Sequence, residues 1–81
     1  MTTITLIGKP ECHLCDVARE VVDLVVAESG QDVVIEERSI LDDAELYARW
    51  WEKIPVVLID GDLHAHWRLD AARLSAALRD A

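Results

Sequence analysis

Residues 4–15 read ITLIGKPECHLC: an apolar run, a break at Gly8 and Pro10, and two cysteines separated by two residues. The apolar run over residues 4–7 predicts a strand, because β-branched and aliphatic residues are bounded there by turn-forming ones. After the break, apolar residues recur at helical spacing over residues 13–29, and Gly30 follows as a C-terminal stop. The stretch therefore predicts a strand, a tight connection and a helix that begins beside the cysteines.

The rest of the chain continues this alternation. Residues 32–38 predict a second strand, and DDAE at 42–45 resembles a capping box that opens a short helix running through Trp51. A buried-looking strand at 56–59 is followed by the hairpin turn Asp60-Gly61 and a returning strand at 63–66. Asp70 then caps a last helix, whose predicted inward residues are Leu74, Ala77 and Leu78.

This order, β-α-β-α-β-β-α, predicts the fold class. The first β-α-β crossover is right-handed and makes a parallel pair, while the hairpin adds antiparallel strands. We expect residues 1–81 to form a single α/β domain, with a four-stranded mixed sheet flanked by helices.

Composition and charge limit the classes of function. The 81 residues include 16 acidic and 8 basic side chains, a formal net charge of −8, which argues against nucleic acid or an anionic membrane as a partner. No apolar run approaches the roughly 20 residues that span a bilayer, and the N-terminus lacks a secretory signal. We therefore expect a cytoplasmic protein, and a monomer because its acidic surface repels other copies.

The only two cysteines, Cys12 and Cys15, form one CxxC motif. They would close too short a loop to stabilise the fold much, so redox chemistry or metal binding remains. Cys12 falls where a strand ends and a helix begins, a place where unpaired N–H groups and the helix dipole favour a thiolate. Cys15 lies nearly one turn further, so it can resolve a mixed disulfide formed on Cys12.

Charged neighbours of Cys12 act in both directions. Lys9 and a protonated His13 favour the thiolate, whereas Glu11 and Asp16 oppose it. Because the helix N–H groups point at the sulfur while the carboxylates can turn to solvent, we expect the pKa of the Cys12 thiol to be lowered. Cys15 should be less exposed and remain a thiol.

Two segments carry a resemblance to a known family. KPECHLC at residues 9–15 and KIPVV at residues 53–57 resemble the glutaredoxin-like branch of the thioredoxin superfamily, and the element order matches over essentially the whole chain. The resemblance implies a thioredoxin fold and a thiol–disulfide oxidoreductase that reduces protein disulfides or glutathione mixed disulfides. Cys12 and Cys15 would be its catalytic pair.

The same resemblance implies substrate-binding residues and partners. Lys9 matches a lysine that pairs with a glutathione carboxylate, and Ile54-Pro55 matches a cis peptide bond beside the two sulfurs. There the backbone of Ile54 would pair with an extended substrate. No bound cofactor is implied; electrons would come from glutathione or from a thioredoxin-reductase-like flavoenzyme.

The chain also departs from ordinary glutaredoxins. His13 and Leu14 stand between the cysteines in place of Pro-Tyr, and we expect these two residues to tune the reduction potential. The Gly-Gly that lets glutathione approach is absent; residues 63–68 read LHAHWR, and Trp67 is expected to wall the substrate groove.

Two other classes of function stay open at this point. One is a non-catalytic binding module, in which Cys12, Cys15 and either His64 or His66 hold zinc, or two chains share an iron–sulfur cluster. The other is a thioredoxin-fold adaptor in which the cysteines are incidental. We assign no metal ligand, because His64 and His66 alternate with apolar residues, as on the solvent-facing side of an edge strand.

Overall fold

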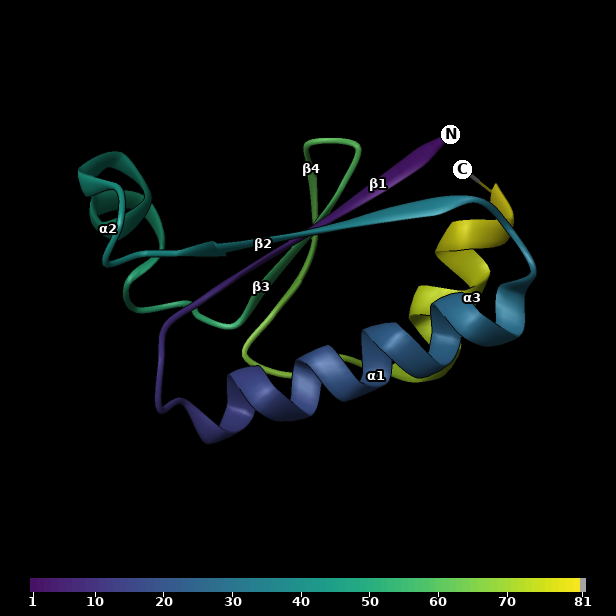
Figure 1. Ribbon diagram of the computed structural model, residues 1–81, viewed down its shortest axis with the longest axis horizontal. Helices are drawn as coiled ribbons and strands as arrows, with labels where there is room; N and C mark the ends of the chain where they lie inside the picture. Colours follow the sequence, from purple (N-terminus) through teal and green to yellow (C-terminus); the bar gives the residue numbers. More distant parts are fainter. Residues whose placement is uncertain (81) are drawn as a thin grey trace.

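The computed structural model describes residues 1–80, in which seven elements follow one another in the predicted order (Figure 1). The elements are β1 (Thr2–Gly8), α1 (His13–Ser29), β2 (Val33–Ser39), α2 (Ala44–Trp50), β3 (Val56–Ile59), β4 (Asp62–His66) and α3 (Ala71–Asp80).

The four strands form one mixed sheet in the order β2-β1-β3-β4. β1 pairs with β2 in parallel, as the crossover through α1 requires, and β3 pairs antiparallel with both β1 and β4. The predicted fold class is therefore confirmed.

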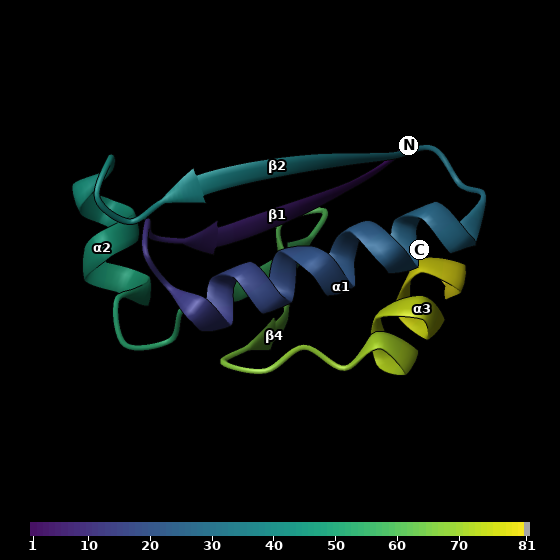
Figure 2. The same ribbon diagram turned by 60° about the horizontal axis from the view of Figure 1, so that its bottom comes forward.

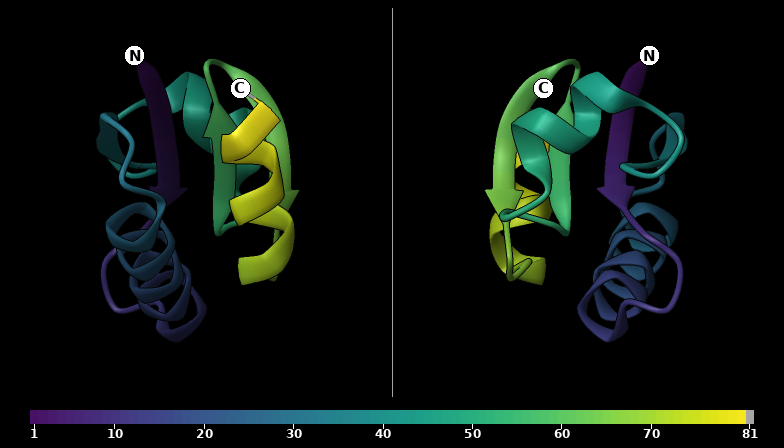
Figure 3. Two further views of the ribbon diagram at one scale, coloured as in Figure 1. Left: turned by 90° about the vertical axis from the view of Figure 1, so that its right-hand side faces the viewer. Right: turned by 90° about the vertical axis from the view of Figure 1, so that its left-hand side faces the viewer.

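Each face of the sheet has its own apolar cluster, because side chains alternate along a strand. On one face, α1 and α3 lie side by side and bury Ile4, Leu6 and Val57 (Figures 2 and 3). On the other face, α2 covers only one end, where Trp50 packs with Ile7, Ile40 and Val56. Trp50 is thus buried, whereas the neighbouring Trp51 is half-exposed.

The ends of the helices follow local sequence rules. Gly30 ends α1 in the left-handed region, at φ 68°, and the backbone N–H of Arg73 donates to the Asp70 carboxylate at 3.0 Å, which caps α3. The cap of α2 is Asp43, whose carboxylate accepts from the backbone N–H groups of Glu45 and Leu46. The capping-box pattern placed this cap one residue too early.

The start of the chain differs in one respect from the prediction. Gly8 does not break the first strand but ends it, in register with Ser39 of β2. The break therefore begins at Lys9. Among residues 1–80, no helix is long and apolar enough to cross a membrane.

Candidate active site

Cys12 is the N-cap of α1, with extended backbone angles of φ −109° and ψ 109°. Its Sγ accepts a hydrogen bond from the backbone N–H of Cys15 at 3.2 Å, and its carbonyl accepts one from Asp16 at 3.1 Å. The sulfur thus takes the place of the oxygen that usually caps a helix, at the positive end of a 17-residue helix. This arrangement favours negative charge on Cys12.

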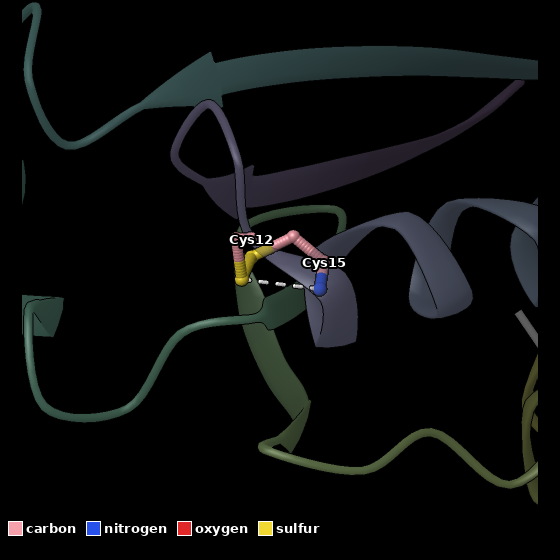
Figure 4. Close-up of a disulfide and its surroundings, with 2 residues drawn as sticks. All are labelled: Cys12 and Cys15. Atoms are coloured by element: carbon pink, nitrogen blue, oxygen red, sulfur yellow. Dashed lines mark hydrogen bonds between the residues drawn. A yellow bond between two sulfur atoms is a disulfide. The ribbon is translucent and has the colours of Figure 1, made fainter.

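Cys12 and Cys15 are joined by a disulfide, with Cα atoms 5.2 Å apart (Figure 4). Cys12 is half-exposed, whereas Cys15 is 5% exposed, which confirms the expected difference in exposure. An external thiol or disulfide can therefore reach Cys12 more easily than Cys15.

Gly8 provides the space for the sulfur of Cys15. Gly8 shares a face of β1 with Ile4 and Leu6, the face that α1 covers. A Cβ built on Gly8 would lie 2.8 Å from Sγ of Cys15 and 3.1 Å from its Cβ, closer than side chains pack. The sequence interpretation treated Gly8 only as a break in the strand. Because residues two apart in a strand share a face, its position after Leu6 already indicated that Gly8 lies on the face covered by α1.

Ile54 and Pro55 lie at the same end of the sheet as the cysteines. Val56 pairs with Ile7, so Pro55 stands beside the end of β1 at Gly8; the connection into β3 can be followed in Figure 4. The Ile54-Pro55 peptide bond is cis, as the resemblance implied. Within residues 1–80, no hydrogen bond engages the backbone N–H or C=O of Ile54.

Trp67 holds this connection from the opposite side. Its backbone N–H donates to the Pro55 carbonyl at 2.9 Å and lies 3.3 Å from the Lys53 carbonyl, while its indole N–H donates to the Glu52 carbonyl at 2.7 Å. No local pattern in the sequence predicts these contacts, because they join residues more than ten positions apart.

Two pockets of different character lie beside the first turns of α1. One holds about 290 Å³ and is lined by charged side chains together with Gly8 and Cys15. Two of its three cations are already paired, Arg19 with Glu37 and Arg38 with Glu36. Lys9, the third, makes no ion pair among residues 1–80.

The other pocket, also about 290 Å³, is mainly apolar. It is lined by Leu14, Val17, Ala18, Trp67, Arg68 and Leu69. Leu14 and Trp67 are each about half-exposed there, at 51% and 55%. His13, the other residue between the cysteines, is exposed and is absent from both linings.

The histidines of β4 differ in their surroundings. β4 is an edge strand, and His66 is exposed as expected, but His64 is half-buried. The register with β3 shifts between Val57 and Leu58, which interrupts the alternation that placed both rings in solvent. Burial, with a smaller effect from Arg73, lowers the pKa of His64 below its ordinary value. Among residues 1–80, no three His, Cys, Asp or Glu side chains gather closely enough to hold a metal ion.

Comparisons with known proteins agree with this geometry. Residues 3–79 match the family described as Glutaredoxin-like domain (DUF836). Uncharacterized proteins of Mycobacterium tuberculosis and Mycobacterium bovis are 28% identical over 76 residues, which cover 90% of this chain and 78% of theirs.

Solved structures place the same fold in other organisms. A structural genomics target protein from X. campestris is 33% identical with a TM-score of 0.77, over 96% of this chain and 97% of that one. A mutant thioredoxin from Halobacterium salinarum, 17% identical, superposes with a TM-score of 0.70 over 98% of this chain and 73% of its own. The second likeness establishes the thioredoxin fold.

Proposed function

This chain belongs to the glutaredoxin-like domain family, and on that basis we propose that it is a thiol–disulfide oxidoreductase working through Cys12 and Cys15. Its substrates are protein disulfides or glutathione mixed disulfides. The observation that carries the proposal is the asymmetry of the pair: one sulfur is half-exposed at a helix N-terminus and the other is buried beside Gly8.

The first step is an attack by Cys12. In the reduced protein, the backbone N–H of Cys15 and the N-terminus of α1 stabilise a thiolate on Cys12. This thiolate attacks one sulfur of the substrate disulfide, forms a mixed disulfide and releases the other substrate sulfur as a thiolate, which takes a proton from solvent.

The second step is resolution by Cys15. Its thiol loses a proton to solvent, and the resulting thiolate attacks the Cys12 sulfur of the mixed disulfide and releases the second substrate thiol. The substrate gains two electrons and two protons, and the protein is left with the Cys12–Cys15 disulfide of this structure. Two molecules of glutathione, or a thioredoxin-reductase-like flavoenzyme, return the electrons.

Lys9, Ile54 and Pro55 position the substrate in this proposal. The unpaired backbone groups of Ile54 suit an extended substrate chain, and Pro55 shapes the edge of the groove. Lys9, exposed and without an ion pair among residues 1–80, suits a substrate carboxylate. His13 and Leu14, in the first turn between the sulfurs, tune the stability of the reduced thiolate.

The test is a redox titration read by mass. The protein is equilibrated in glutathione buffers of graded poise, free thiols are alkylated, and the species are resolved by intact mass. We expect a reversible two-electron transition between dithiol and disulfide in the wild type, and a glutathione adduct on Cys12 in Cys15→Ser.

Three other outcomes of the titration are informative. A clean transition with no adduct keeps the oxidoreductase and favours the flavoenzyme as donor. Thiols that stay reduced at every poise would contradict the proposal. Thiols that react only after a chelator is added would favour a metal-binding module instead.

A further inference from the structure

Trp67 lies between the connection into β3 and the apolar pocket beside α1. On one side, its backbone and indole N–H groups hold the connection between α2 and β3 at Glu52 and Pro55. On the other side, it lines the apolar pocket with Leu14 and Val17 of α1. Figure 2 shows the segment between β4 and α3, which begins with Trp67, running alongside α1. Trp67 therefore links the connection that carries Pro55 to the wall of the apolar pocket.

The backbone of Trp67 shows that a tryptophan here comes at a cost. Its φ is 64°, in the left-handed region that favours glycine and is unfavourable for a bulky side chain. The indole hydrogen bond to Glu52 offsets part of this cost, whereas the bond to Pro55 uses the backbone N–H, which glycine would also supply. The side chain is 55% exposed, so burial in the core does not explain its presence.

The pocket suits an apolar side chain better than glutathione. Five of its six lining residues are apolar and only Arg68 is charged. Glutathione carries two carboxylates and an ammonium group and has no apolar side chain, so it would leave these surfaces in contact with water. A volume of about 290 Å³ is large enough for one aliphatic or aromatic side chain.

The pocket adjoins the reactive turn through Leu14, which lies between the two cysteines, while the cysteines themselves are not part of its lining. A substrate sulfur held at Cys12 thus brings the residue next to it towards Leu14 and Trp67. We infer that Trp67 is a specificity-determining residue, which makes the protein prefer disulfides whose cysteine has an apolar neighbour over glutathione disulfides. This inference rests on the oxidoreductase function proposed above.

The test compares three mixed disulfides that share one leaving group, the chromogenic thiol thionitrobenzoate. It is joined to a short peptide with Leu beside its cysteine, to the same peptide with Ser in place of Leu, or to glutathione. Reduced protein attacks the peptide or glutathione sulfur and releases the coloured thiolate, so all three report the same step. For the wild type, we expect kcat/KM with the Leu peptide to be about 10-fold higher than with the Ser peptide or with glutathione, mainly because KM is lower.

Variants of Trp67 and Leu14 distinguish the contribution of the pocket wall to the preference from that of the hydrogen bond between Trp67 and Glu52. Trp67→Gly suits the backbone at φ 64° and should reduce the preference to about twofold or less. Trp67→Phe keeps a ring but loses the hydrogen bond to Glu52, and should retain most of the preference. Leu14→Ala should lose it, whereas Leu24→Ala, an exposed leucine further along the same helix, should not. Thermal unfolding checks that each variant is folded.

Each outcome of these assays bears either on the role of Trp67 or on the proposed function. An equal rate with the three disulfides in the wild type, or a preference unchanged in folded Trp67→Gly, would overturn the role of Trp67 and leave the oxidoreductase intact. Release of thionitrobenzoate no faster than with Cys12→Ser, for all three disulfides, would overturn the proposed function itself and the inference with it.

Discussion

The two ends of α1 share one helical pattern and differ in what lies beside them. Towards the C-terminal end, Val22 and Val25 are buried in the same cluster as Leu74 and Leu78 of α3. At the N-terminal end, Leu14 and Val17 remain exposed, at 51% and 42%, beside the disulfide. The buried face runs along the whole helix, since Cys15 and Ala18 are also buried, and Leu24 is exposed further along. The open, N-terminal end is distinguished because its exposed residues lie beside the disulfide.

The difference separates stability from chemistry within a single helix. The packed end buries apolar surface. Burial of apolar surface throughout the protein supplies most of the free energy of folding in a domain of this size. The open end directs the backbone N–H of Cys15 at the Cys12 sulfur and leaves Leu14 and Val17 exposed. Substitutions at the open, N-terminal end should therefore affect activity, whereas substitutions at the packed, C-terminal end should affect the free energy of unfolding.

The largest expected effect is at the open end. Cys12→Ser removes the attacking thiolate, so the rate of disulfide exchange should fall by about 1,000-fold or more. The free energy of unfolding of the reduced protein should change by less than about 1 kcal/mol, because Cys12 is half-exposed. Retained exchange activity would contradict the role of Cys12 as the attacking group. Chromogenic exchange and urea unfolding measure the two quantities.

The counterpart at the packed end is Leu74→Ala. Leu74 is fully buried between α1 and the sheet, so truncation should lower the free energy of unfolding by about 2–5 kcal/mol. The exposed Leu24→Ala is the matched control, with an expected change within about 0.5 kcal/mol. Exchange rates of both folded variants should match the wild type within about twofold. A slower rate in folded Leu74→Ala would show that the two ends are coupled.

The glycines on either side of α1, Gly8 and Gly30, provide a further pair of variants. Gly8→Ala places a Cβ against the sulfur of Cys15 and should destabilise the protein by about 1–3 kcal/mol through overpacking. It should also change the lifetime of the mixed disulfide on Cys12, because Cys15 has to move. Trapping that species with acid and reading it by intact mass gives the lifetime.

Gly30→Ala is the control for Gly8→Ala. Its Cβ would meet no atom within 4 Å, but φ 68° is unfavourable for alanine, so a loss of about 1–2 kcal/mol is expected. The lifetime of the mixed disulfide should not change. Equal effects of the two variants on that lifetime would mean that Gly8 acts only through general stability.

The smallest expected effect is a dependence of stability on pH at His64. The pKa of His64 is below 6.5 in the folded protein because of burial and the positive charge of Arg73, so the unfolded chain binds the proton more tightly. Stability should fall as the pH drops below 6.5 and level off below the folded pKa. Urea unfolding of His64→Gln between pH 7 and pH 5 should lack this fall. The same fall in the variant would assign it to other groups.

Much of the fold follows from local patterns. The spacing of apolar residues over 13–29 located α1, and Gly30, Asp70 and the Asp60-Gly61 turn ended or connected the elements as expected. These signals depend on a few neighbouring residues, so they can be recognised without the tertiary structure. The cap of α2 shows the precision that such a pattern allows, since two consecutive aspartates fit it and the structure uses the second.

The sequence alone was enough to predict that the CxxC motif lies between a strand and a helix. It was also enough to predict that Ile54-Pro55 precedes a later strand. The surroundings of the site, in contrast, became known only from the tertiary structure. Gly8 lies against the sulfur of Cys15, the Trp67 indole donates a hydrogen bond to Glu52, and a register shift half-buries His64. The physical reason is distance along the chain. Helix periods, caps and turns are encoded by adjacent residues, whereas these contacts join segments whose separation is set by the packing of the sheet and its helices.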